Sequence, residues 1–405
     1  MCSQLSLAAG LCELVLDLEG RAAAAVPAKF NKLSRLTQLD SLQLRGTALS
    51  WDPDHLVAAL PRLTRLTRLG LQFDWDHWDA SGFCQYAFPW TAVCGLLNLR
   101  ELRVTSVADV EHSCTSMLKG ALPAAMSRLT ALRCLEVLGM REWDVRLDDS
   151  DQLQLAALPA LETAALRLHT LCGGYPGLCG RQDVVLSRLV SLSLGLRMDV
   201  DAGDSCTDTH LPFIIAPAMT ELILDDIKLG SDSEQLSWLP RMPSLRRLVL
   251  KDVKTASSQI PQGVVQCRRL RELVLNRFHV NYSQRPHDKR IHRAECRLRS
   301  LPAGPYLSEL VSLSLGRNAF SSVPPCLASA AALESLDLSQ QNLQDRSCEL
   351  HSAPVQGLHV LDKLTRLRRV SLVGYRIDSV GVHRFQAYHP NAKLLMERCA
   401  YASSR

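Results

Sequence analysis

Side chains that could bind a metal ion gather at two places in the sequence. His287, His292 and Cys296 carry zinc-ligand atoms, but their spacing matches no common zinc site and no fourth ligand is evident. Residues 199–208 are rich in aspartate, as calcium loops are. Their glycine, Gly203, stands one position early, and no glutamate occupies the twelfth position. The sequence therefore predicts no metal site and no cofactor.

Signatures of catalysis are missing as well. The sequence contains no GxxxxGK[ST], HExxH or GxSxG motif, and no GxGxxG follows an expected strand. Serine, histidine and aspartate are scattered, with no spacing that would indicate a nucleophile beside its base. We therefore expect a protein that is not an enzyme, and we keep an enzyme with a cryptic site as an alternative.

Aromatic side chains that could anchor a partner are concentrated in residues 73–90, FDWDHWDASGFCQYAFPW. This segment holds seven of the 21 aromatic residues. Tryptophan and tyrosine are enriched at binding hot spots, where one residue can contribute about 2 kcal/mol. The same rings could instead fold back over the core as a lid. The partner-binding candidates in this segment are Trp75, Trp78, Phe83, Tyr86 and Trp90.

The elements that would position these residues follow from a repeat, L-x-x-L-x-L. Thirteen copies start at Leu11, Leu39, Leu66, Leu99, Leu132, Leu161, Leu189, Met219, Leu245, Leu270, Leu310, Leu333 and Leu367. The first and last starts are 356 residues apart, so the mean of the 12 intervals is about 30 residues. A fixed period of this size is typical of solenoids.

Each copy ends in strict apolar alternation, which predicts a short strand with leucine on one face. A single strand cannot bury that face, whereas parallel strands stacked rung on rung share one apolar interior. A second apolar segment, such as VPAKFNKLSRL or LPAAMSRLTAL, returns the chain to the next strand. At 52–66 this segment predicts a helix, with Asp52 as N-cap and Pro53 at the first helical position.

One copy, LVSLSLGRNAFSSVP at 310–324, resembles the leucine-rich repeat family. Its family positions are Leu310, Leu313, Leu315, Asn318, Phe320 and Pro324. The resemblance implies an α/β solenoid, a curved horseshoe with a parallel sheet on the concave face and helices and turns on the convex face. It covers residues 1–380 as one domain of about 13 repeats, with longer units at 66–131 and 270–309. Residues 381–405 would form a C-terminal cap and tail.

The departures from the family concern its asparagine. Most repeats have another residue there, for example Ile227, Val253 and Phe278. Because this asparagine normally hydrogen-bonds the backbone of neighbouring turns, we expect irregular turns. The repeats are most similar to free-standing intracellular proteins of plants and algae.

The strand positions that point outward form the concave surface, which mixes charged, polar and small residues. Solenoids of this family usually bind proteins there, so we expect protein partners of unknown identity. No stripe of lysine and arginine would follow a phosphate backbone, and the net charge is only +5, so we expect no nucleic acid. The charged candidates are Arg45, Arg68, Glu101, Arg103, Arg167, Asp225, Arg247 and Lys251.

Charge is segregated along the chain. Residues 141–234 hold 7 basic and 16 acidic residues, a net charge of −9, whereas residues 241–299 hold 15 basic and 4 acidic residues, a net charge of +11. Such a distribution would steer a partner during encounter. Ordinary solvated loops are the alternative, and a basic loop at 281–300 is included in this second stretch.

The 14 cysteines include no CxxC pair, and the first twenty residues make a poor secretory signal. No 18-residue apolar run is free of charge, so we expect no membrane span. These observations predict reduced thiols and a monomeric cytoplasmic protein, with a cytoskeletal or axonemal location implied by the resemblance. We therefore expect a non-catalytic scaffold or adaptor. The alternatives are a substrate-recognition subunit of a ubiquitin ligase and a fragment of an immune-type receptor.

Overall fold

The computed structural model describes thirteen stretches of the chain, which fall into two compact units. Unit 1 comprises residues 1–207 and 212–216, and unit 2 comprises residues 208–211 and 217–405. The described residues are 10–17, 30–47, 53–74, 90–107, 122–142, 155–170, 184–198, 214–229, 236–255, 259–280, 298–339, 356–375 and 379–396.

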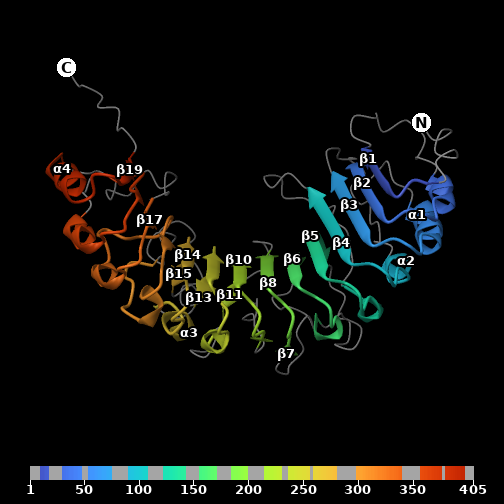
Figure 1. The fold of residues 1–405 in the computed structure, drawn as a ribbon, viewed down its shortest axis with the longest axis horizontal. Helices are drawn as coiled ribbons and strands as arrows, with labels where there is room; N and C mark the ends of the chain where they lie inside the picture. Colours follow the sequence, from blue (N-terminus) through green and yellow to red (C-terminus); the bar gives the residue numbers. More distant parts are fainter. Residues whose placement is uncertain are drawn as a thin grey trace, which may run out of the picture. The chain divides into compact units, whose positions relative to one another are not determined.

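Parallel strands in chain order form the sheet of unit 1 (Figure 1). Each starts two residues after the first leucine of its repeat, as the alternation predicts. They are β1 (Glu13–Asp17), β2 (Ser41–Thr47), β3 (Arg68–Asp74), β4 (Glu101–Val107), β5 (Cys134–Glu142), β6 (Thr163–Thr170) and β8 (Ser191–Met198). A second, smaller ladder pairs β7 (Val184–Val185) with β9 (Ile214–Ile215).

Unit 2 repeats this design with its own parallel strands. They are β10 (Glu221–Asp225), β12 (Arg247–Lys251), β14 (Glu272–Asn276), β16 (Ser312–Ser314), β17 (Ser335–Asp337), β18 (Arg369–Ser371) and β19 (Lys393–Leu395). A short strand follows each of β10, β12 and β14 in the chain, and these short strands form a second parallel ladder. They are β11 (Lys228–Leu229), β13 (Lys254–Thr255) and β15 (His279–Val280).

The leucines of neighbouring repeats lie in register and form the core. In unit 2 Leu248 is aligned with Leu273, and Leu273 with Leu313, and none of these side chains is more than 1% exposed. In unit 1 Leu69 is aligned with Leu102 in the same way. Burial of one leucine on the next is the apolar driving force that the repeat predicted. The prediction of a parallel α/β solenoid is confirmed.

Short helices return the chain to the next strand, on the side of each unit opposite the strands (Figure 1). The prediction of a helix starting at Pro53 is confirmed. In unit 1 the helices are η2 (Phe30–Arg35), α1 (Pro53–Ala59), η4 (Leu60–Arg62), α2 (Trp90–Val93), η5 (Ala124–Arg128) and η7 (Leu155–Ala157). In unit 2 they are η8 (Leu239–Arg241), α3 (Gln262–Val265), η10 (Pro305–Leu307), η11 (Pro325–Ser329), η13 (Leu358–Lys363) and α4 (Ser379–Tyr388).

The turns that follow the strands of unit 2 are more uniform than the missing asparagines led us to expect. Asp226, Asp252, Arg277 and Arg317 occupy the same place in successive repeats, and all have a φ between 52° and 63°. At the next position Ile227, Val253 and Phe278 are fully buried. The expectation of irregular turns is wrong here, because an apolar side chain packed into the core holds the same turn.

The segment that the sequence suggested as a cap provides α4 and β19. Phe385 and His389 are buried, and their ring centroids lie 4.9 Å apart. A ring nitrogen of His389 lies 2.9 Å from the carbonyl oxygen of Leu361 in η13. The contact between His389 and Leu361 attaches the end of α4 to the preceding repeat.

Candidate protein-binding face

The first and third residues of each main strand, and the fifth residue of the longer strands, lie on the side of the sheet away from the leucine core. We call these residues the strand face. In unit 1 the strand face includes the exposed arginines Arg45, Arg68, Arg103 and Arg167, together with the half-buried Glu101. All five were predicted as binding residues from their place in the repeat. The structure places them on the surface of adjacent or nearby strands.

Ion pairs lie on the face of unit 1, within one strand, between neighbouring strands and between strands two apart. Arg68 lies 3.6 Å from Glu13, and Arg103 lies 4.0 Å from Glu101 and 3.7 Å from Glu136. Their side chains are 29–58% exposed, so water screens these pairs and each contributes about 0–1 kcal/mol to stability. Because the pairs are weak, they can exchange for contacts with a partner at small cost.

The face of unit 2 begins with a charged row. Arg247 lies between Glu221 and Glu272 on the two flanking strands, with its Nε 2.9 Å from the Glu272 carboxylate and its Nη1 bonded to Glu221. The hydrogen bond to Glu272, supported by that to Glu221, raises the pKa of Arg247 despite some desolvation. This row keeps fixed charge of both signs on the strand face.

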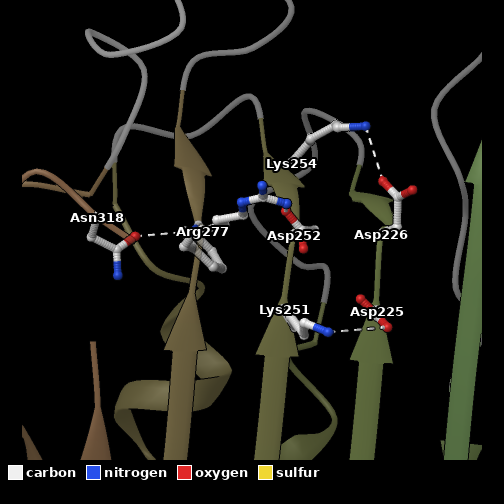
Figure 2. A network of polar contacts seen from close by, with 8 residues as sticks. Asp225, Asp226, Lys251, Asp252, Lys254, Arg277 and Asn318 are labelled. Carbon is white, nitrogen blue, oxygen red and sulfur yellow. Dashed lines mark hydrogen bonds and ion pairs between the residues drawn. The ribbon is translucent and has the colours of Figure 1, made fainter. Parts of the chain in front are cut away.

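The next two rows combine an apolar strip with polar contacts. Ile223, Val249 and Val274 form the strip, and Val249 is only 7% exposed because longer side chains surround it. Beyond it, Lys251 and Asp225 point toward each other with 3.9 Å between their charged atoms (Figure 2). An apolar strip between charged rows is a surface that a protein partner could cover.

A further ladder of ion pairs, which the sequence analysis did not single out, lies where the strands of unit 2 end. Lys254 lies 3.1 Å from Asp226, and Arg277 lies 3.0 Å from Asp252 (Figure 2). Each pair joins two neighbouring repeats. Arg277 and Asp252 occupy the same turn position of adjacent repeats, and Lys254 lies two residues after the equivalent of Asp226, so the opposite charges become readable in the sequence only once the register is known.

The predicted aromatic site can be followed at one residue only. Trp75, Trp78, Phe83 and Tyr86 lie outside the described residues. Trp90 starts α2 and is 8% exposed, so its ring packs inside the unit and is not a surface contact.

Groups able to do acid–base or metal chemistry do not converge in the described part of the chain. No cluster of three or more histidine, cysteine, aspartate or glutamate residues suited to a metal ion occurs among the described residues. Both candidate metal segments of the sequence, 199–208 and 287–296, lie outside them.

The buried Tyr306 donates a 2.7 Å hydrogen bond to the carbonyl of Pro302, and burial raises the pKa of this tyrosine. It is a structural donor.

The asparagine of the best repeat makes the contacts that complete the fold. Asn318 is 5% exposed and accepts a 2.9 Å hydrogen bond from the backbone N–H of Phe278 (Figure 2). Its amide also donates to the carbonyls of Leu275 and Leu315. It thereby joins the turns of two repeats, as the resemblance implied. The fold is that of a leucine-rich repeat protein. Leucines in register, parallel strands and this asparagine carry that assignment.

Solved leucine-rich repeat structures are similar to this chain over most of its length. A leucine-rich repeat protein of Leptospira interrogans is 16% identical with a TM-score of 0.46, covering 97% of this chain and 98% of that one. The leucine-rich repeat domain of APL1B is 15% identical with a TM-score of 0.49, covering 98% and 92%. An internalin of Listeria monocytogenes is 15% identical with a TM-score of 0.42, covering 90% and 76%.

Comparisons of sequence alone give no match. No protein-family model matches the chain, and no curated protein is significantly similar to it. Across the part of the chain that the structure describes, no helix has both the length and the apolar character to cross a bilayer.

Proposed function

We propose that this chain is a non-catalytic scaffold or adaptor that binds a protein partner on the strand face. The observation that carries the proposal is the strand face itself, a regular array of half-exposed polar and charged side chains repeated over successive strands. In unit 2 this array encloses the apolar strip of Ile223, Val249 and Val274. Interfaces combine a small apolar centre with a polar rim in this way.

The weak ion pairs of the face support the proposal. A charged group of a partner can replace either member of a pair such as Arg103–Glu136 or Lys251–Asp225. The replacement costs little, because each exposed pair contributes only about 0–1 kcal/mol.

The finer parts of the proposal concern the aromatic segment and the setting. Trp75, Trp78, Phe83 and Tyr86 would extend the strand face with aromatic anchors. The setting that the repeats imply is the cytoplasm, including the cytoskeleton or a cilium, where an adaptor would join two other proteins.

The experiment is affinity purification followed by mass spectrometry. The wild type is compared with the strand-face variant Arg45→Glu, Lys251→Glu, which reverses one exposed charge in each unit. The matched control is Arg62→Glu, Lys363→Glu, which makes the same charge change at exposed positions on the short helices. A third variant, Trp75→Ala, Trp78→Ala, tests the aromatic segment.

The proposal expects partners that the wild type and the helix control retain and the strand-face variant loses. Partners retained equally by the strand-face variant and the control would overturn it. Partners lost only from the tryptophan variant would assign binding to the aromatic segment and overturn the strand face as the site.

A further inference from the structure

Four arginines gather at one edge of unit 2, where the chain turns into β12 and β14. Arg246 immediately precedes β12 and Arg271 immediately precedes β14, and the two lie side by side because the Arg271 N–H donates a 2.8 Å hydrogen bond to the Arg246 carbonyl. Arg268 and Arg269 lie in the turn before β14. We call these four residues the basic edge.

Two of these side chains cross the gap between the repeats in opposite directions. Nη1 of Arg246 donates to the carbonyl of Arg269 at 3.2 Å, and Nη1 of Arg269 donates to the carbonyl of Pro243 at 3.3 Å. A guanidinium has five N–H donors, so most donors of both groups face water. The side chains are therefore held in place while their charge stays available.

No carboxylate among the described residues pairs with any of the four arginines, whereas the same edge is neutralised in other repeats. Near β2 and β3, Arg65 lies 3.4 Å from Asp40, and near β5 and β6, Arg133 lies 3.5 Å from Glu162. Near β17 and β18, Arg368 lies 3.7 Å from Glu334. The basic edge departs from this pattern because residues Thr220 and Val311 stand where a neighbouring carboxylate would be needed.

We propose that the basic edge docks an acidic peptide segment of a protein partner, whose carboxylates take the places that acidic neighbours fill elsewhere. The planar fork of arginine matches a carboxylate in a two-point contact. Arginines on two adjacent strands, whose backbones lie about 4.8 Å apart, can each take one carboxylate of the same peptide. The site lies beside the strand face and outside it, so it can hold or fail independently of the function proposed above.

The features of the edge favour a peptide over a nucleic acid. The arginines span two repeats, about one strand separation, which is too short a track for several phosphates. No residue of the basic edge is aromatic, so there is no platform on which bases could stack.

The test is fluorescence anisotropy of the full chain with a labelled peptide of alternating glutamate and serine. Arg268→Glu, Arg271→Glu is the test variant, because both side chains are exposed and neither donates a hydrogen bond to any residue that the structure describes. The matched control is Arg100→Glu, Arg188→Glu, which reverses two exposed edge arginines of unit 1. A single-stranded oligonucleotide of equal charge serves as the second probe, and Arg268→Lys, Arg271→Lys tests the need for the arginine fork.

We expect the test variant to bind the peptide at least about tenfold more weakly than the control, which corresponds to about 1.4 kcal/mol. The lysine variant should fall between the wild type and the test variant, and added salt should weaken binding. No measurable peptide binding by the wild type, or equal losses in both glutamate variants, would overturn the proposal. Tighter binding of the oligonucleotide that is lost in the test variant would reassign the edge to nucleic acid and overturn it as well.

Discussion

Single residues show how this chain tolerates the loss of a family feature. Asn318 satisfies three backbone groups of two turns, whereas Ile227, Val253 and Phe278 hold equivalent turns by being buried. Both solutions keep the preceding residue in the left-handed region. The difference is that the asparagine turn depends on one buried polar side chain, and the apolar turns depend on packing.

Replacing that side chain should therefore be costly. Asn318→Ala leaves the Phe278 N–H and two carbonyls without their partner in the interior, so we expect a loss of about 1–3 kcal/mol in the free energy of unfolding. Denaturant titration measures it. The control is Asn391→Ala, an exposed asparagine in unit 2, which should change stability by less than about 0.5 kcal/mol. Equal stability of the two variants would contradict the role given to Asn318.

The cysteines lead to a second prediction at this scale. Cys267 is 6% exposed and donates a 3.1 Å hydrogen bond to the carbonyl of Gly263, and burial raises its pKa from the ordinary 9.0 to about 12. Burial also raises the pKa of Cys94 to about 11. Because the thiolate is the reactive form, both should resist alkylation near neutral pH while the exposed Cys12 reacts.

Alkylation followed by peptide mass spectrometry measures this order, with unfolded protein as the control in which all three thiols react.

The raised thiol pKa values also make the stability of the fold depend on pH. In the unfolded chain Cys267 ionises near pH 9, whereas in the folded chain it stays protonated until about pH 12. Ionisation of the unfolded chain favours unfolding, so the contribution of Cys267 to the free energy of unfolding is complete below about pH 9 and is lost toward pH 12. Fast labelling of Cys267 in the folded chain would contradict its burial.

At the scale of elements, the close approach of α3 to the turn before η8 depends on a glycine. A Cβ atom on Gly263 would lie 1.8 Å from the carbonyl oxygen and 2.6 Å from the carbonyl carbon of Leu236, which are backbone atoms. Leu236 itself has a φ of 65°, so the backbone at this point has little freedom to move away. The contact fixes how closely two neighbouring repeats stack.

Gly263→Ala should therefore destabilise the protein by more than about 3 kcal/mol, because a backbone contact cannot relax as a side chain can. The control is Gly70→Ala on the strand face, where the new Cβ would meet only the flexible Gln43 side chain at 3.3 Å. That change should be nearly neutral, since alanine loses less backbone entropy than glycine. Thermal unfolding compares the two, and an undiminished melting temperature in Gly263→Ala would refute the proposed contact.

The elements also show what the sequence could predict and what it could not. Periodic leucines predicted the strands, their parallel order and the inward rows, because burial of one face leaves a single register. The ion pairs between Lys254 and Asp226 and between Arg277 and Asp252 were not foreseen, since they join residues more than twenty positions apart. Trp90 was predicted as a surface contact, but the sequence does not encode which ring of an aromatic segment turns inward.

At the scale of the whole molecule, each repeat touches its neighbours and little else. In such a chain stability is a sum of local and nearest-neighbour contributions, so damage at one end need not reach the other. Repeats can then open in groups, so a substitution lowers stability most in its own unit. The carboxyl-terminal helix α4 is the place to test this, since it covers the last repeats of unit 2.

Phe385→Ala should remove the main apolar contact of α4. Its side chain is 2% exposed and lies against His389, so truncation should cost about 3–5 kcal/mol locally. Hydrogen exchange should then show lost amide protection in α4, η13 and β18, while the strands β2 to β4 of unit 1 keep theirs. Val380→Ala on the same helix is the control, because Val380 is 74% exposed. Loss of protection spread evenly over both units would mean that the repeats unfold as one cooperative body, and nearest-neighbour stability would then be the wrong description of this solenoid.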